Sequence, residues 1–173
     1  ALWYATELQT ALGVSVPDDI RVKGVSIDTR TLQEGDLFVA LTGQSDGHAY
    51  VADAHKKGAA AALVRTHQDV PLPQIDVDAT LDALEKMGTY RRKQMQGKVV
   101  AITGSAGKTS TKEMMALVLG AHASAASYNN HFGVPLTLAR MPQKAERAVF
   151  EIGMNAPGEI APLARMVRPH VAV

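Results

Sequence analysis

Residues 98–110 read KVVAITGSAGKTS, and this stretch decides how the chain around it folds. An apolar run rich in β-branched residues ends at Thr103 and Gly104, a loop of small residues follows, and another apolar stretch begins after Thr109. A strand, a glycine-containing loop and a helix in that order are the setting that a phosphate-binding loop requires. The stretch therefore predicts a strand that carries such a loop at its carboxyl end.

The residue types of this loop suit the binding of a nucleotide. Gly104 and Gly107 allow backbone amides to turn inward around an anion, and the amides that open the following helix add a positive dipole end. Lys108 is placed to neutralise phosphate charge and Thr109 to ligate the Mg²⁺ that accompanies ATP. Ile102 stands where the commoner spacing has a further glycine, so a plain strand-to-helix turn is the alternative. The predicted nucleotide-binding residues are Gly104, Ser105, Ala106, Gly107, Lys108, Thr109 and Ser110.

The composition excludes several classes of protein. Of the 173 residues, 46% are hydrophobic and 20% charged, which is typical of a globular chain and not of a disordered one. The net charge of +1 gives no electrostatic reason to expect a nucleic-acid partner. No apolar run approaches the roughly 20 residues of a membrane span, no signal peptide is recognisable, and the absence of cysteine excludes disulfides. We expect a cytoplasmic protein without a membrane span.

Hydrophobic patterns predict an α/β fold in two domains. Helices are expected at 6–12 and 49–57, and short strands at 20–22, 25–27, 37–41, 59–64 and 72–77. A helix capped by Asp78 or Thr80 and running to about Gln94 follows, and its basic residues Lys86, Arg91, Arg92 and Lys93 predict a solvated face. We predict a small mixed α/β domain over 1–78 and the start of a parallel-sheet P-loop ATPase domain over 79–173.

Strands and helices alternate in the second domain. Residues 111–119 are apolar nearly all round, which predicts a helix buried against a sheet. A helix near 135–139, a strand at 148–152, a helix to Val167 and a strand at 170–173 follow. This alternation implies parallel strands with right-handed crossovers, and in such sheets ligands bind at the carboxyl ends of the strands.

Two further groups are candidates for chemistry, and the first lies at that edge. Glu151 ends an apolar strand, and its carboxylate reaches the Mg²⁺ held by Thr109 if the two strands are neighbours. A strand-end carboxylate in solvent is the alternative. Asn129 and Asn130 lie in a polar loop, where their amides either bind a carboxylate, an acyl phosphate or a ribose, or only cap the loop.

Three motifs taken together, TGSAGKT at 103–109, NNHFGVP at 129–135 and EIGMNAPGEI at 151–160, resemble the Mur ligase family. These are ATP-dependent amide-bond ligases of peptidoglycan precursor synthesis. The stretches SIDTR at 26–30 and GDLFVAL at 35–41, with Asp46, Gly47 and His48, are similar to the members that add the third residue or the D-Ala-D-Ala dipeptide. The EIGMNAPGEI string resembles the dipeptide-adding member.

The resemblance implies that D-Ala-D-Ala is joined to UDP-MurNAc-tripeptide through an acyl phosphate, with ATP and Mg²⁺ as cofactors. Lys108 and the loop amides would hold the phosphates, and Thr109 and Glu151 the Mg²⁺. Asn129 and Asn130 would line the path to the acceptor carboxylate as catalytic residues with Lys108. The residues implied to bind the UDP-MurNAc-peptide are Thr29, Arg30, Gln44, Ser45, Asp46 and His48.

Members of the family are longer than this chain, which stops at Val173 inside the implied central domain. We therefore expect the 173 residues to lack ligase activity on their own and to leave a sheet edge exposed. Two alternatives stay open. One is the ligase that adds the third residue, and the other is a nucleotide-binding module or NTPase that does not ligate.

Overall fold

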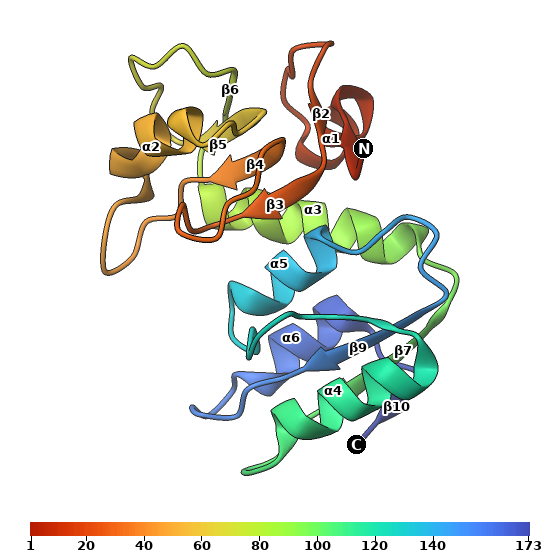
Figure 1. The fold of residues 1–173 in the computed structure, drawn as a ribbon. Coiled ribbons are helices and arrows are strands. Elements are labelled where there is room, and N and C mark those ends of the chain that lie inside the picture. Colours follow the sequence, from red (N-terminus) through yellow and green to blue (C-terminus); the bar gives the residue numbers. More distant parts are fainter. The chain divides into compact units, whose positions relative to one another are not determined.

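The structure, a computed structural model, describes all residues 1–173, which form two units that divide between Met87 and Gly88 (Figure 1). The division falls inside α3 (Thr80–Gln94). The sequence-based limits of 1–78 and 79–173, which assign the whole helix to the second domain, stay a prediction. The helices lack the combination of length and apolar character that a membrane-spanning helix needs.

The first unit is built on a parallel sheet in the order β3-β4-β5-β6, and it also contains the antiparallel pair β1-β2. The sequence does not predict β1, because two residues are too few for a periodic pattern. The elements are β1 (Trp3–Tyr4), α1 (Ala5–Leu12), β2 (Arg21–Val22), β3 (Gly24–Ser26), β4 (Asp36–Val39), the 3-10 helix η1 (Gly47–Tyr50), α2 (Val51–Lys56), β5 (Ala61–Val64) and β6 (Gln74–Asp76).

The two central strands of this sheet are the ones that the apolar runs predict. Every residue of β4 and β5 is buried, as is typical of parallel strands that are covered on both faces. Val39 pairs with Leu63, and all three strand pairs of the sheet are parallel. Thr29 and Arg30 follow β3, and residues 44–48 follow β4, so both segments start from the same edge of the sheet.

The second unit is a parallel sheet in the order β10-β7-β9-β8. The α/β fold class with a parallel second sheet is thus confirmed. The two-residue edge strand β8 is not predicted from the sequence, for the same reason as β1. The elements are β7 (Lys98–Ile102), α4 (Lys108–Leu119), β8 (His122–Ala123), α5 (Gly133–Ala139), β9 (Arg147–Glu151), α6 (Ile160–Val167) and β10 (Val171–Ala172).

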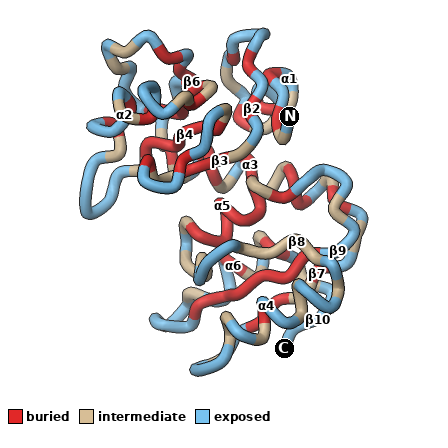
Figure 2. Tube along the Cα trace, in the orientation of Figure 1, coloured by how far each residue is buried: buried red, intermediate tan, exposed pale blue.

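Helices cover both faces of this second sheet. Helix α4 contacts β7, β8 and β9 on one face, while α5 and α6 contact each other and the sheet on the other (Figure 1). The core around the central strands includes Val99, Phe150 and Leu163, and Figure 2 shows the buried course of β9. At the edge, β10 carries exposed Val171 and is followed by exposed Val173, in agreement with the expected exposed edge.

The prediction that the helix after the phosphate-binding loop is buried nearly all round is wrong. Lys112 is the buried residue of α4, whereas Met114, Leu117 and Val118 are 61%, 84% and 82% exposed. The helix packs on the sheet through one face, and no other element of residues 1–173 covers the opposite face. An apolar pattern alone does not indicate which part of a helix meets a neighbour.

The predicted solvated face of α3 is also partly wrong. Lys86 and Lys93 are exposed, but Arg91 and Arg92 are buried. The Arg92 guanidinium donates to the carbonyl oxygens of Val167 (2.6 Å) and Arg168 (2.8 Å), where α6 ends. It thereby satisfies carbonyl groups that a helix terminus leaves without partners, and this interaction explains its burial.

Candidate functional site

The phosphate-binding loop connects the end of β7 at Ile102 to the start of α4 at Lys108. Gly104 and Gly107 have φ angles of 141° and 76°, a region of backbone conformation that favours glycine. A Cβ atom would meet nothing within 4 Å at Gly107, so its backbone conformation and not crowding requires glycine there. No side chain caps the amino end of α4, which leaves that end suited to an anionic ligand.

The side chain of Lys108 folds over the loop from which it starts. Its Nζ atom donates to the Gly104 carbonyl oxygen at 2.6 Å. An ammonium group has three N–H donors, so this bond leaves donors for phosphate oxygens. The structure therefore places the Lys108 charge at the loop, as its nucleotide-binding assignment requires.

The strand order brings Glu151 to the phosphate-binding loop. Strands β7 and β9 are neighbours, and Ile102 pairs with Glu151. The Thr109 hydroxyl lies 3.1 Å from each carboxylate oxygen of Glu151 and donates to this group. Glu151 is 2% exposed, so the alternative of a carboxylate in solvent is wrong.

The environment of Glu151 fits a bound cation. None of the ion pairs in the structure neutralises this carboxylate, although buried charges are usually paired or coordinate a metal. No cluster of three or more Asp, Glu or His side chains is present to supply a metal cage. One hydroxyl and one carboxylate are instead the small protein contribution that Mg²⁺ accepts when phosphates and water supply the remaining oxygen ligands.

Two residues of the loop between β8 and α5 complete this group of side chains. The Asn129 side chain donates from Nδ2 to Glu151 Oε1 at 2.9 Å. Ser127 Oγ lies 2.9 Å from Thr109 Oγ1, and because the Thr109 proton is directed to Glu151, Ser127 is the donor. Sequence reasoning missed Ser127, since a serine in a polar loop carries no distinguishing signal.

The neighbouring Asn130 has a different position. Its Oδ1 atom accepts the backbone N–H of Gly133 at 2.8 Å, at the first residue of α5. A Cβ atom at Gly133 would lie 2.7 Å from the backbone of Tyr128, so the chain passes too closely there for any other residue. Of the two asparagines assigned to catalysis, the structure places Asn129 against Glu151 and gives Asn130 a bond that starts a helix.

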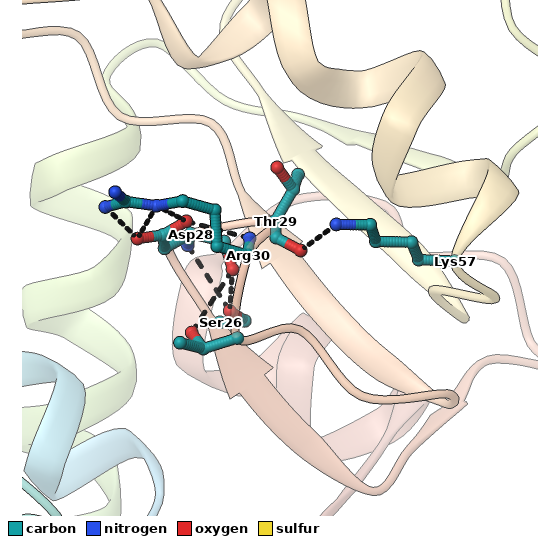
Figure 3. Close-up of polar contacts among 6 residues, drawn as sticks. Ser26, Asp28, Thr29, Arg30 and Lys57 are labelled. Atoms are coloured by element: carbon teal, nitrogen blue, oxygen red, sulfur yellow. Dashed lines mark hydrogen bonds and ion pairs between the residues drawn. The ribbon is translucent and has the colours of Figure 1, made fainter.

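In the first unit, the segment after β3 is held by hydrogen bonds among its own charged groups (Figure 3). Asp28 accepts from Arg30 through Nε (3.0 Å) and Nη2 (2.7 Å), and these bonds lower the pKa of Asp28, although burial opposes the shift. Lys57 donates from Nζ to the Thr29 carbonyl oxygen at 2.7 Å. Figure 3 shows Arg30 folded over Asp28 while Lys57 reaches Thr29 from the other side.

The segment after β4 is organised by a buried histidine. His48 Nδ1 lies 2.6 Å from Asp46 Oδ1, and His48 Nε2 accepts the backbone N–H of Arg65 at 2.9 Å. The ring therefore carries its proton on Nδ1, and hydrogen bonds from His48 lower the pKa of Asp46. Gln44 and Ser45 are exposed in the same segment. Both ring nitrogens of His48 are thus occupied within the protein, whereas Gln44 and Ser45 face solvent.

Comparison with known families covers nearly the whole chain. The family described as "Mur ligase family, catalytic domain" matches residues 21–121, and "Mur ligase middle domain" matches residues 102–173. Together these matches include the residues of both four-stranded sheets.

Individual relatives share one name, UDP-N-acetylmuramoyl-tripeptide–D-alanyl-D-alanine ligase. The protein of Rickettsia prowazekii is 38% identical over 99% of this chain and 40% of its own length. Those of Bacillus subtilis and Escherichia coli are 41% and 42% identical, over 88% and 90% of this chain and 35% of their own length. The chain therefore spans 35–40% of the length of these curated relatives.

Solved structures show the same likeness. MurF from Acinetobacter baumannii superimposes with a TM-score of 0.84 at 37% identity, over 98% of this chain and 40% of that one. A MurF ligase from Thermotoga maritima, in complex with ADP, gives a TM-score of 0.68 at 28% identity, over 88% of this chain and 37% of that one.

Proposed function

Because the chain belongs to the Mur ligase family, we propose that it provides the phosphate site of an ATP-dependent ligase that joins D-Ala-D-Ala to UDP-MurNAc-tripeptide. The observation that carries this proposal is the contact between Thr109 and Glu151. A buried carboxylate without a cation of its own is bonded to the hydroxyl of a phosphate-binding loop. The names of the relatives supply the reaction.

The residues of the second unit have distinct roles in this proposal. The loop from Gly104 to Ser110 and the Lys108 ammonium bind the β- and γ-phosphates of ATP. Thr109 and Glu151 hold Mg²⁺, which when bound offsets negative charge on the phosphate oxygens. Asn129 orients the Glu151 carboxylate, and the loop that includes Asn130 borders the acceptor carboxylate.

We assign the UDP part of the second substrate to the first unit. Thr29 and Arg30 follow β3, and Gln44, Ser45, Asp46 and His48 follow β4, at the edge where parallel sheets bind ligands. Asp28 keeps Arg30 in place through two bonds. Since both ring nitrogens of His48 are occupied, its part is to shape the loop that carries Gln44 and Ser45. We also propose that the protein is cytoplasmic, in line with the absence of a membrane-spanning helix among these residues.

The test is a ligation assay with the protein that carries this chain. We expect phosphate release that requires ATP, Mg²⁺, UDP-MurNAc-tripeptide and D-Ala-D-Ala together. Activity with a diamino acid and UDP-MurNAc-dipeptide, but not with D-Ala-D-Ala and UDP-MurNAc-tripeptide, would assign the protein to the ligase that adds the third residue. ATP hydrolysis that ignores both acceptors would indicate an NTPase. The isolated 173 residues are expected to show no ligation.

A further inference from the structure

Lys112 is a buried lysine that the proposed function does not use. It lies in α4, one turn after Thr109, and it is 1% exposed. Lysine is almost never fully buried unless its ammonium is paired. Here no carboxylate pairs with it, and the bonds that satisfy the ammonium all go to one loop.

The three acceptors of Lys112 belong to the segment that follows β8. Its Nζ atom donates to the Ser124 carbonyl oxygen (2.9 Å), the Ala126 carbonyl oxygen (3.2 Å) and Ser124 Oγ (3.3 Å). An ammonium has three donors, so these three neutral acceptors match its capacity. A methionine of similar length would fill the space but leave the loop oxygens without this donor.

The same loop continues into the candidate phosphate site. Ser127 bonds Thr109, and Asn129 bonds Glu151, directly after the segment that Lys112 holds. Helix α4 therefore grips the loop at two places, through Thr109 at its first turn and through Lys112 one turn later. Loss of the Lys112 contacts would therefore allow Ser127 and Asn129, which contact Thr109 and Glu151, to move.

We propose that Lys112 is a positioning residue for the metal side of the phosphate site. Its ammonium fastens residues 124–126 to α4 and thereby sets Ser127 and Asn129 against Thr109 and Glu151. This inference rests on the proposed function of that site. It predicts a specific division of effects: Lys112 supports the part of nucleotide affinity that depends on Mg²⁺, whereas Lys108 and the loop amides supply the part that does not.

The experiment compares Lys112→Met, Lys112→Arg and the exposed-lysine control Lys93→Met in the protein that carries this chain. Binding of ADP is measured by calorimetry with and without Mg²⁺, and amide hydrogen exchange is followed over residues 124–130. We expect Lys112→Met to reduce the Mg²⁺-dependent gain in ADP affinity about fivefold or more, with little change in metal-free binding. Exchange at 124–130 should accelerate, Lys112→Arg should recover part of both effects, and Lys93→Met should resemble the wild type.

A folded Lys112→Met protein with the wild-type response to Mg²⁺ would overturn this inference and leave the proposed function standing. Wild-type protein that binds ADP neither with nor without Mg²⁺ would overturn both. If Lys112→Met does not fold, Lys112→Gln, which keeps two of the N–H donors, provides the same comparison. Lower stability with unchanged Mg²⁺ dependence in that variant would mean that Lys112 is only structural.

Discussion

The carboxylates at the carboxyl edges of the two parallel sheets differ in whether a cationic side chain of the protein pairs with them. In the first unit the Asp28 carboxylate forms an ion pair with the Arg30 guanidinium, while the exposed Asp46 carboxylate accepts a hydrogen bond from His48 Nδ1. In the second unit Glu151 is buried, bonded to a hydroxyl and an amide, and paired with no cation. An edge whose charges are matched internally is shaped before a ligand arrives. Under the proposed function, the edge with the unmatched Glu151 carboxylate is completed by the Mg²⁺ that accompanies the nucleotide.

Removing the charge of Lys108 in the second unit should have the largest effect on ADP binding. We expect Lys108→Met to weaken ADP binding roughly 100-fold, because charge-assisted bonds to phosphate contribute about 1.5–3 kcal/mol each. Calorimetric titration of the protein that carries this chain measures the change, with Lys93→Met as the matched control. Equal ADP affinities of the two variants would contradict the assignment of the phosphate-binding site to this loop.

Neutralising the unmatched carboxylate should separate binding from stability. We expect Glu151→Gln to lose about tenfold of the Mg²⁺-dependent ADP affinity, since a carboxamide is a poorer magnesium ligand than a carboxylate. The metal-free protein should keep or gain stability, because the variant no longer buries an unpaired charge. Urea unfolding without Mg²⁺ and ADP titration with it give the two readings, and exposed Glu146→Gln is the control. Strong destabilisation of metal-free Glu151→Gln would contradict the comparison.

The two units should also respond to acid in different ranges of pH. Burial lowers the pKa of His122 below its usual 6.5, although its hydrogen bond to the Thr137 carbonyl opposes the shift and the Arg140 charge adds to it. Between the lowered pKa and 6.5 the unfolded chain binds more protons, so the stability of the second unit falls as the pH drops below 6.5. The pKa of Asp28 and that of Asp46 are lowered from 3.8, so their contributions in the first unit are lost only below that pH.

This pH difference is measured from the urea midpoint of the 173 residues between pH 7.5 and 4, in the wild type and in His122→Gln. Below pH 6.5 the urea midpoint of His122→Gln should decrease less than that of the wild type. Because the chain has six histidines, the difference between the two curves is the informative quantity. Parallel curves would show that His122 does not set this response.

Breaking a matched pair in the first unit should have the smallest effect. Arg30 is 86% exposed at its side chain, and pairs of this kind contribute about 0–1 kcal/mol. We expect Asp28→Asn to change the free energy of unfolding by less than about 1 kcal/mol, and to weaken UDP binding only moderately because Arg30 stays near its place. Thermal unfolding and UDP titration of Asp28→Asn test this expectation. Lys57→Met, which removes the hydrogen bond to the Thr29 carbonyl and leaves the Asp28–Arg30 pair in place, is the variant for comparison. A loss above 3 kcal/mol in Asp28→Asn would show that the pair is structural.

Local patterns predicted much of this molecule. The phosphate-binding loop, its strand and its helix follow from the residues at 98–119, because glycine conformation and hydrophobic spacing act over a few positions. The end of the helix at Thr80–Gln94 was predicted, whereas its start was left between two possible caps, Asp78 and Thr80. The strands β1 and β8 were not predicted, since each has only two residues and exists through its pairing with a distant partner.

In the candidate site, too, some features follow from the sequence and others depend on tertiary contacts. Glu151 was identified by its place at a strand end, but its burial and its contact with Thr109 depend on β7 and β9 being neighbours. The burial of Lys112 and Arg92 could not be predicted, because it depends on contacts with distant segments: Lys112 donates to Ser124, 12 positions away, and Arg92 to Val167, 75 positions away. Ser127 belongs to the site for the same reason: α4 passes beside it.

The sequence by itself determined the α/β class, the glycine-containing loop between β7 and α4 and the membership of the family, because these depend on residue order and on conformations set within a few residues. The tertiary structure alone decided how the charged side chains of the second unit are surrounded. It buries Glu151 against Thr109 without a cation and directs Lys112 to the loop after β8, since these contacts join segments that meet only when the chain has folded.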